Sequence, residues 1–110
     1  DFPRELAVAA GAGMGRGIGG SGCVCGALNG GVAFIGLVTA DKARAKPLVS
    51  ELHDAFRDGT GRGITCCRAL TRGMEWGSAE RRAQCQRFCA LAAGEAARIL
   101  AGALGVAVED

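Results

Sequence analysis

The sequence predicts an all-α fold, a small bundle of about four helices around a buried central helix. Apolar residues recur at three- and four-residue spacing, and the β-branched alternation of strands is nearly absent. Aromatic residues make up only 5% of the chain, so alanine, glycine and small aliphatic side chains must fill the interior, which favours closely packed helices. A length of 110 residues with 49% hydrophobic residues suits a single cysteine-rich domain over residues 1–110.

The N-terminal half predicts a short helix, a loop and a central helix. Residues 3–10 have the pattern of a short helix, and residues 11–22 form a glycine-rich loop. Residues 23–39 are apolar on nearly all sides, which is typical of a helix with neighbours around it. The apolar part is too short for a membrane span, which needs about 20 apolar residues. We therefore expect this helix to be central in the bundle.

An amphipathic helix follows and ends at about Asp58, because apolar residues recur there at helical spacing. Pro47 suits the first turn of this helix, and the polar residues 41–46 form a turn or a helical lead-in. Residues 59–63 contain three glycines and predict a break before the next element.

The C-terminal half predicts a short helix and a long one. Thr65 is a candidate cap for a short helix carrying Cys66 and Cys67, and Ser78 is a candidate cap for a helix over residues 79–104. The expected core face of the long helix consists of Cys85, Phe88, Cys89, Ala92, Ala96 and Ile99.

Six cysteines fall into three pairs, namely Cys23 and Cys25, Cys66 and Cys67, and Cys85 and Cys89. Residues four apart on a helix have Cβ atoms about 5–6 Å apart, whereas a disulfide needs about 3.5–4.5 Å. The other two pairs are too close in sequence for an unstrained bridge. Disulfides would therefore join different pairs, and ligation of a metal or cluster is the alternative.

The spacing of the cysteines narrows the choice of cofactor. No CxxC pair of the kind common in zinc sites is present, and no CxxCH motif for c-type haem. All-sulfur ligation is compatible with zinc, copper(I) or an iron–sulfur cluster. Two of the pairs lie at predicted helix starts, where the helix dipole lowers a thiol pKa and favours thiolate.

Residues Cys25 to Gly30 read CGALNG, which matches a CGAxxG motif between a glycine-rich loop and an apolar helix. This resembles the C_GCAxxG_C_C family of proteins described as redox-active, which is related to the non-haem region of split-Soret cytochromes. Cys67, followed by Arg-Ala-Leu, and Cys89 resemble the two downstream cysteines of the family. The resemblance covers nearly the whole chain, and it implies redox activity with an iron–sulfur cluster, of unspecified type, on Cys25, Cys67 and Cys89.

The upstream cysteine of the family has no counterpart in this sequence, so the fourth ligand is either one of the additional cysteines or a cysteine outside this chain segment. If this chain alone binds the cluster, one of the additional cysteines completes the set of four. Cys85 shares a helix face with Cys89, and Cys23 needs only a small loop adjustment. Cys66 would diverge by about 100° from its neighbour on a helix. Cys85 or Cys23, rather than Cys66, is therefore the expected fourth ligand.

Other motifs carry weaker indications. Gly15 to Gly20 match GxGxxG without a preceding strand, which favours a packing loop near the cysteines over a nucleotide site. His53, the single histidine, lies off the apolar stripe of its helix and is expected at the surface. Trp76 is expected to cover the core, or otherwise to contact a partner.

The leading hypothesis is an electron-transfer domain that holds an iron–sulfur cluster. The alternatives are metal-free thiol–disulfide redox chemistry and a structural, disulfide-stabilised interaction domain. The expected partner is a redox protein or a larger redox assembly, and a homo-oligomer stays open. The net charge of +2 without a basic stripe argues against nucleic acid. A cytoplasmic location, or an extracytoplasmic one after removal of a signal, fits the sequence.

Overall fold

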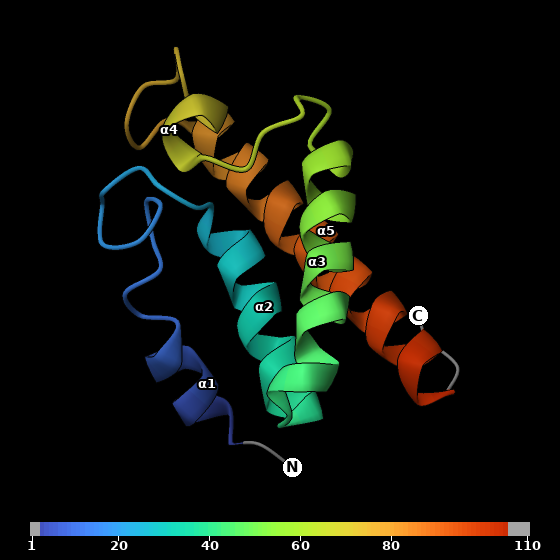
Figure 1. The fold of residues 1–110 in the computed structure, drawn as a ribbon. Coiled ribbons are helices and arrows are strands. Elements are labelled where there is room, and N and C mark those ends of the chain that lie inside the picture. The colour runs from blue at the N-terminus through green and yellow to red at the C-terminus, as the bar shows by residue number, and fades with distance from the viewer. Residues whose placement is uncertain (1–2, 106–110) are drawn as a thin grey trace.

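The computed structural model describes residues 3–105, and within them it contains five helices and no strand (Figure 1). The all-α prediction is confirmed. The helices are α1 (Arg4–Ala10), α2 (Gly26–Thr39), α3 (Lys42–Gly59), α4 (Cys67–Leu70) and α5 (Ala79–Leu104).

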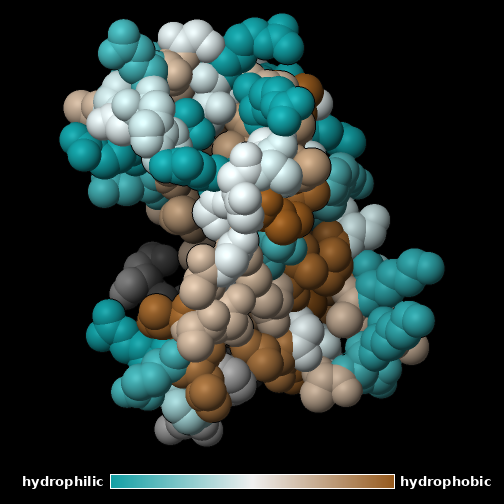
Figure 2. Space-filling model, turned by 90° about the vertical axis from the view of Figure 1, so that its left-hand side faces the viewer, coloured by the Kyte–Doolittle hydropathy of each residue, from teal (hydrophilic) through white to brown (hydrophobic). Residues whose placement is uncertain are grey.

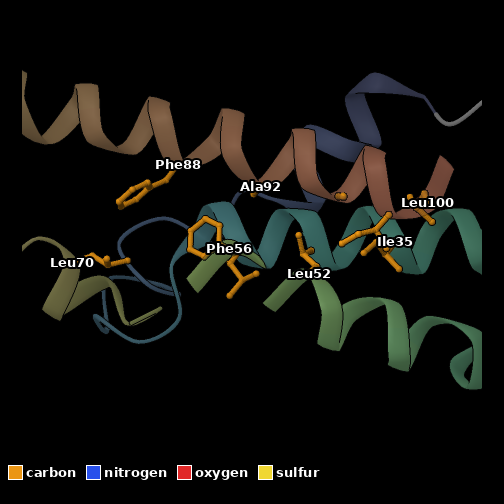
Figure 3. Packing of buried hydrophobic residues seen from close by; sticks show 10 residues of the cluster. Ile35, Leu52, Phe56, Leu70, Phe88, Ala92 and Leu100 are labelled. Carbon is orange, nitrogen blue, oxygen red and sulfur yellow. The ribbon is translucent and has the colours of Figure 1, made fainter. Parts of the chain in front are cut away.

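Three of these helices build the core, because α2, α3 and α5 each pack against the other two. Figure 3 shows their buried side chains meeting along the length of α5. At one end, the Phe56 and Phe88 rings contact edge to face with their centroids 5.8 Å apart, and Leu70 of α4 packs beside them. The core consists of Leu28, Ile35, Leu52, Phe56, Leu70, Phe88, Ala92, Ala96, Ile99 and Leu100.

Helix α2 contacts both α3 and α5, as expected of a central helix, but it is not covered on all sides. It begins at Gly26, so Cys23 and Val24 precede it rather than forming its first turn. A row of its apolar side chains, Phe34, Leu37 and Val38, remains exposed. Figure 2 shows apolar atoms gathered over the middle and lower part of one face of the molecule.

Helix α3 begins earlier than predicted. The Asp41 side chain accepts a hydrogen bond of 2.9 Å from the Ala43 N–H, which caps the helix directly before Lys42. Pro47 is consequently inside the helix, as its sixth residue, and not in its first turn. The acidic cap thus outweighed the proline as a start signal.

Of the two predicted helix caps in the C-terminal half, one is confirmed and one is wrong. Ser78 accepts a hydrogen bond of 3.1 Å from the Arg81 N–H, which confirms it as the cap of α5. Thr65 is not the cap of α4, since that position belongs to Cys66, which makes no side-chain capping bond.

Helix α1 has no buried residue and is joined to α2 by the glycine-rich loop. In Figure 1 this loop rises from α1 toward the end of the molecule that holds α4 and the start of α5. None of the helices in residues 3–105 is long and apolar enough to cross a membrane.

Candidate thiol cavity

Four cysteines line one cavity of about 720 Å³ at the end of the bundle where α2, α4 and α5 begin. They are Cys25, Cys67, Cys85 and Cys89. Residues of the glycine-rich loop, of α2, of the loop over residues 71–78 and of α5 complete the wall. Among the residues that the structure describes, no aspartate, glutamate or histidine lines it, so sulfur is the dominant donor that they offer.

A short antiparallel contact places Cys25 and Cys67 at this cavity. Val24 and Cys66 form an isolated bridge, on either side of which the Cys25 N–H donates to the Thr65 carbonyl at 2.9 Å and the Cys67 N–H donates to the Cys23 carbonyl. Two segments about 40 residues apart in sequence are thereby fixed side by side. Both thiols are half-buried.

Cys85 and Cys89 lie one turn apart on α5, and both are exposed toward the cavity rather than buried in the core. Their predicted place on the core face is therefore wrong. The buried row of α5 begins instead at Gln84, whose side-chain N–H donates to the Leu70 carbonyl at 2.9 Å. This hydrogen bond satisfies the buried amide of Gln84. Cys85 and Cys89 each follow a buried residue of α5 by one position, so their thiols point away from the core.

Cys23 and Cys66 do not line the cavity. Both are exposed, and the Cys66 thiol donates to the Gly22 carbonyl at 3.0 Å. The structure thus brings Cys85, and not Cys23, to the same cavity as the three cysteines of the family motif.

Burial raises the pKa of the Cys25 thiol, although the N–H groups of Ala27 and Leu28 at the start of α2 act in the opposite direction. The neighbouring Cys67 and Cys85 thiols add to the rise. The expectation that a helix start would lower this pKa is wrong, because desolvation outweighs the helix terminus.

The Cys89 thiol behaves in the same way. Although the residue is exposed toward the cavity, the surrounding atoms partly desolvate its thiol and raise its pKa, and the neighbouring Cys85 thiol raises it further. In the protein without a bound metal, both thiols are therefore harder to ionise than ordinary cysteines.

The GxGxxG segment forms a packing loop against the cysteines, as predicted. Its N–H groups bond to carbonyls within the same loop, such as that of Gly19 to the Gly13 carbonyl at 2.8 Å. A Cβ atom at Gly17, whose φ is +71°, would lie 2.7 Å from the Cys67 Cβ. A Cβ at Gly26 would lie 2.7 Å from the Met14 carbonyl oxygen, so glycine is needed where this loop crosses the start of α2.

Trp76 lies at the cavity and does not cover the core, because its side chain is 59% exposed. Two guanidinium groups stack on its ring. The Arg16 Cζ lies 3.1 Å and the Arg81 Cζ 4.5 Å from the ring centroid. This cation–π contact joins the glycine-rich loop to α5 across the cavity wall.

His53 is at the surface, as predicted, and its side chain hydrogen-bonds to Asp54 at 3.1 Å. Within residues 3–105, no three cysteine, histidine, aspartate or glutamate side chains lie close enough together to hold a single metal ion.

Sequence reasoning missed three arginines of the cavity wall, Arg16, Arg81 and Arg82. The sequence does not distinguish these three arginines from the others, because arginines occur throughout the chain. Gln84 was also missed, although its four-residue spacing from Phe88, Ala92 and Ala96 could have indicated the core face.

The family model named "Putative redox-active protein (C_GCAxxG_C_C)" matches residues 1–101 of the chain. No curated protein sequence and no solved structure matches it.

Proposed function

The chain belongs to the C_GCAxxG_C_C family of proteins described as redox-active, and on this premise we propose that it is an electron-transfer domain with an iron–sulfur cluster. Its ligands are the thiolates of Cys25, Cys67, Cys85 and Cys89. The observation that carries the proposal is that these four cysteines, from three separate helices, line one cavity that contains no carboxylate or imidazole.

The donor set fits an iron–sulfur cluster better than a single ion. Thiolates are the usual ligands of these clusters, and four of them are the common complement. A single tetrahedral ion with metal–sulfur bonds of about 2.3 Å would hold its sulfur atoms in close mutual contact. Within the described residues, no three candidate ligands are that close. A [4Fe–4S] cluster binds each of its four thiolates to a different iron atom, and a [2Fe–2S] cluster binds two thiolates to each of its two irons. Either cluster therefore accepts ligands that are spread more widely than those of a single ion.

The charge of the cavity wall also suits bound thiolates. Arg16, Arg81 and Arg82 line the cavity and have no carboxylate beside them in its wall. Burial raises the pKa of Cys25 and Cys89, and the neighbouring thiols raise it further. A positively charged group bound in the cavity would favour the ionised form of both thiols. When bound, an iron–sulfur cluster supplies reversible one-electron transfer, while the surrounding chain sets its potential and solvent access.

The six cysteines allow a test with internal controls. The protein is reconstituted anaerobically with iron and sulfide, and each cysteine is replaced by serine in turn. We expect serine at positions 25, 67, 85 or 89 to remove most of the bound iron and the visible absorption. Cys23→Ser and Cys66→Ser, at exposed sites outside the cavity, should retain both.

The two outcomes against the proposal are distinct. Loss of iron in Cys66→Ser but not in Cys85→Ser would mean that the ligand set is wrong. A wild-type protein that binds no iron, but loses free thiols on mild oxidation, would support metal-free thiol–disulfide chemistry instead.

A further inference from the structure

The positive charge of this chain is concentrated around the thiol cavity. Residues 11–30 and 60–89, which build the site, contain seven arginines and two glutamates, a net charge of +5. The other described residues contain six basic and six acidic side chains. The small net charge of the whole chain therefore conceals one strongly basic region.

We infer that this basic region is the docking surface for an acidic redox protein, which binds over the mouth of the thiol cavity. We call it the arginine rim. Its inner members are the cavity arginines Arg16, Arg81 and Arg82. Its outer members are Arg68, which donates to the Ser21 carbonyl of the glycine-rich loop at 2.9 Å, and Arg72, four residues further along the chain. Neither lines the cavity. The inference rests on the proposed function, since it names the class of partner that would exchange electrons with the site.

The arginine rim is not neutralised by the chain itself. Within residues 3–105 its members form no ion pair, whereas Arg57 and Arg98 elsewhere pair with nearby carboxylates. Four of the five are exposed, and Arg81 is half-buried beside Trp76. Thiolates in the cavity would balance its inner members, but the outer members remain available to carboxylates of a partner.

The position of Trp76 favours a protein over a nucleic acid. Tryptophan and arginine are enriched among the residues that dominate protein interfaces, and here an exposed tryptophan and two arginines lie together in the cavity wall. Single-stranded nucleic acids instead stack their bases on several free aromatic faces. Here Trp76 is the one aromatic side chain of the cavity wall, and Arg16 already stacks on its ring.

The test measures association with a [2Fe–2S] ferredoxin chosen for its net negative surface. The rim variant is Arg68→Glu with Arg72→Glu, and neither residue lines the cavity. The control is Arg44→Glu with Lys46→Glu, which changes the net charge equally at the start of α3, at the opposite end of the molecule from α4 (Figure 1). Iron and sulfide are counted in every variant, so that loss of the cluster is seen separately from loss of docking.

We expect the association rate to fall at least about tenfold in the rim variant and less than about twofold in the control. The wild-type rate should also fall steeply between about 50 mM and about 300 mM salt. Equal losses in both variants would overturn the inference, because net charge alone would then explain them. So would a single-stranded DNA oligonucleotide that binds the rim more tightly than the ferredoxin does. If the chain holds no iron, the proposed function fails, yet the same two variants still decide whether the rim binds an acidic protein.

Discussion

Cys25 combines two opposing influences on one thiol. It caps α2, where the Ala27 and Leu28 N–H groups favour its thiolate, but burial dominates and raises its pKa. Alkylation of the cluster-free protein by iodoacetamide should therefore be slow at neutral pH, because the thiolate is the reacting form.

The rate at Cys25 should increase with pH through a midpoint above that of an unstructured cysteine peptide, and Cys89 should follow the same direction. Peptide mapping by mass spectrometry after timed alkylation measures each site separately. A midpoint for Cys25 below that of the peptide would mean that the start of α2 outweighs burial after all.

Single residues show where the sequence was sufficient and where it was not. Ser78 was predictable, because a capping residue acts through the backbone N–H groups of the next turn. The sequence pattern predicts Cys85 and Cys89 on the core face of their helix, because cysteine is an apolar residue that is commonly buried. The core position belongs to the polar Gln84, whose role depends on the carbonyl of Leu70, 14 residues away. Side-chain polarity does not reveal such a partner.

At the scale of elements, the start of α2 depends on the close approach of the glycine-rich loop. Gly26→Ala would place a Cβ 2.7 Å from the Met14 carbonyl oxygen, so that the backbone of the loop or the helix must move. We expect a loss of about 1–3 kcal/mol in the free energy of unfolding, together with weaker iron retention.

Gly36→Ala is the matched control for this change. It lies in the same helix, it does not line the thiol cavity, and no atom lies within 4 Å of the position that its Cβ would take. Alanine should stabilise the helix there by up to about 1 kcal/mol. Urea denaturation followed by circular dichroism compares the two, and equal effects would show that the Met14 contact is unimportant.

Element boundaries were predictable where a local signal stood alone and failed where two signals competed. Asp41 and Pro47 are both start signals, and the one with a hydrogen-bonding partner determined where α3 begins. Helix α2 reads as apolar on nearly all sides, yet among the described residues it packs mainly on α3 and α5, and Phe34, Leu37 and Val38 stay exposed. The pattern predicts what a helix can bury, and the number of neighbours decides how much it does bury.

At the scale of the molecule, the core and the site occupy different parts of the bundle. Phe56 is fully buried and contacts Phe88, so Phe56→Ala should cost about 3–5 kcal/mol in the free energy of unfolding. Leu6→Ala in α1, where the side chain is 56% exposed, should change it by less than about 0.5 kcal/mol. Chemical denaturation of both variants checks this, and a large effect of Leu6→Ala would mean that α1 contributes to the folded core.

The all-α class could be predicted because apolar residues recur at three- and four-residue spacing within single helices, which needs no knowledge of tertiary contacts. The convergence of Cys25, Cys67 and Cys89 on one cavity was suggested by the family resemblance, since nothing in their spacing indicates that segments 40 residues apart meet. No motif or family resemblance indicated the three arginines of the cavity wall. They belong to the loop and to α5, and only the tertiary arrangement brings them to the same cavity.

Trp76 is the single tryptophan of the chain, and it stands in the cavity wall with Arg16 stacked on its ring. The unmodified protein therefore carries a built-in optical reporter at its most informative position. Its emission comes from this one site, undiluted by other indoles, so quenching by a coloured cofactor, access of a soluble quencher and approach of a partner can all be followed without attaching a dye.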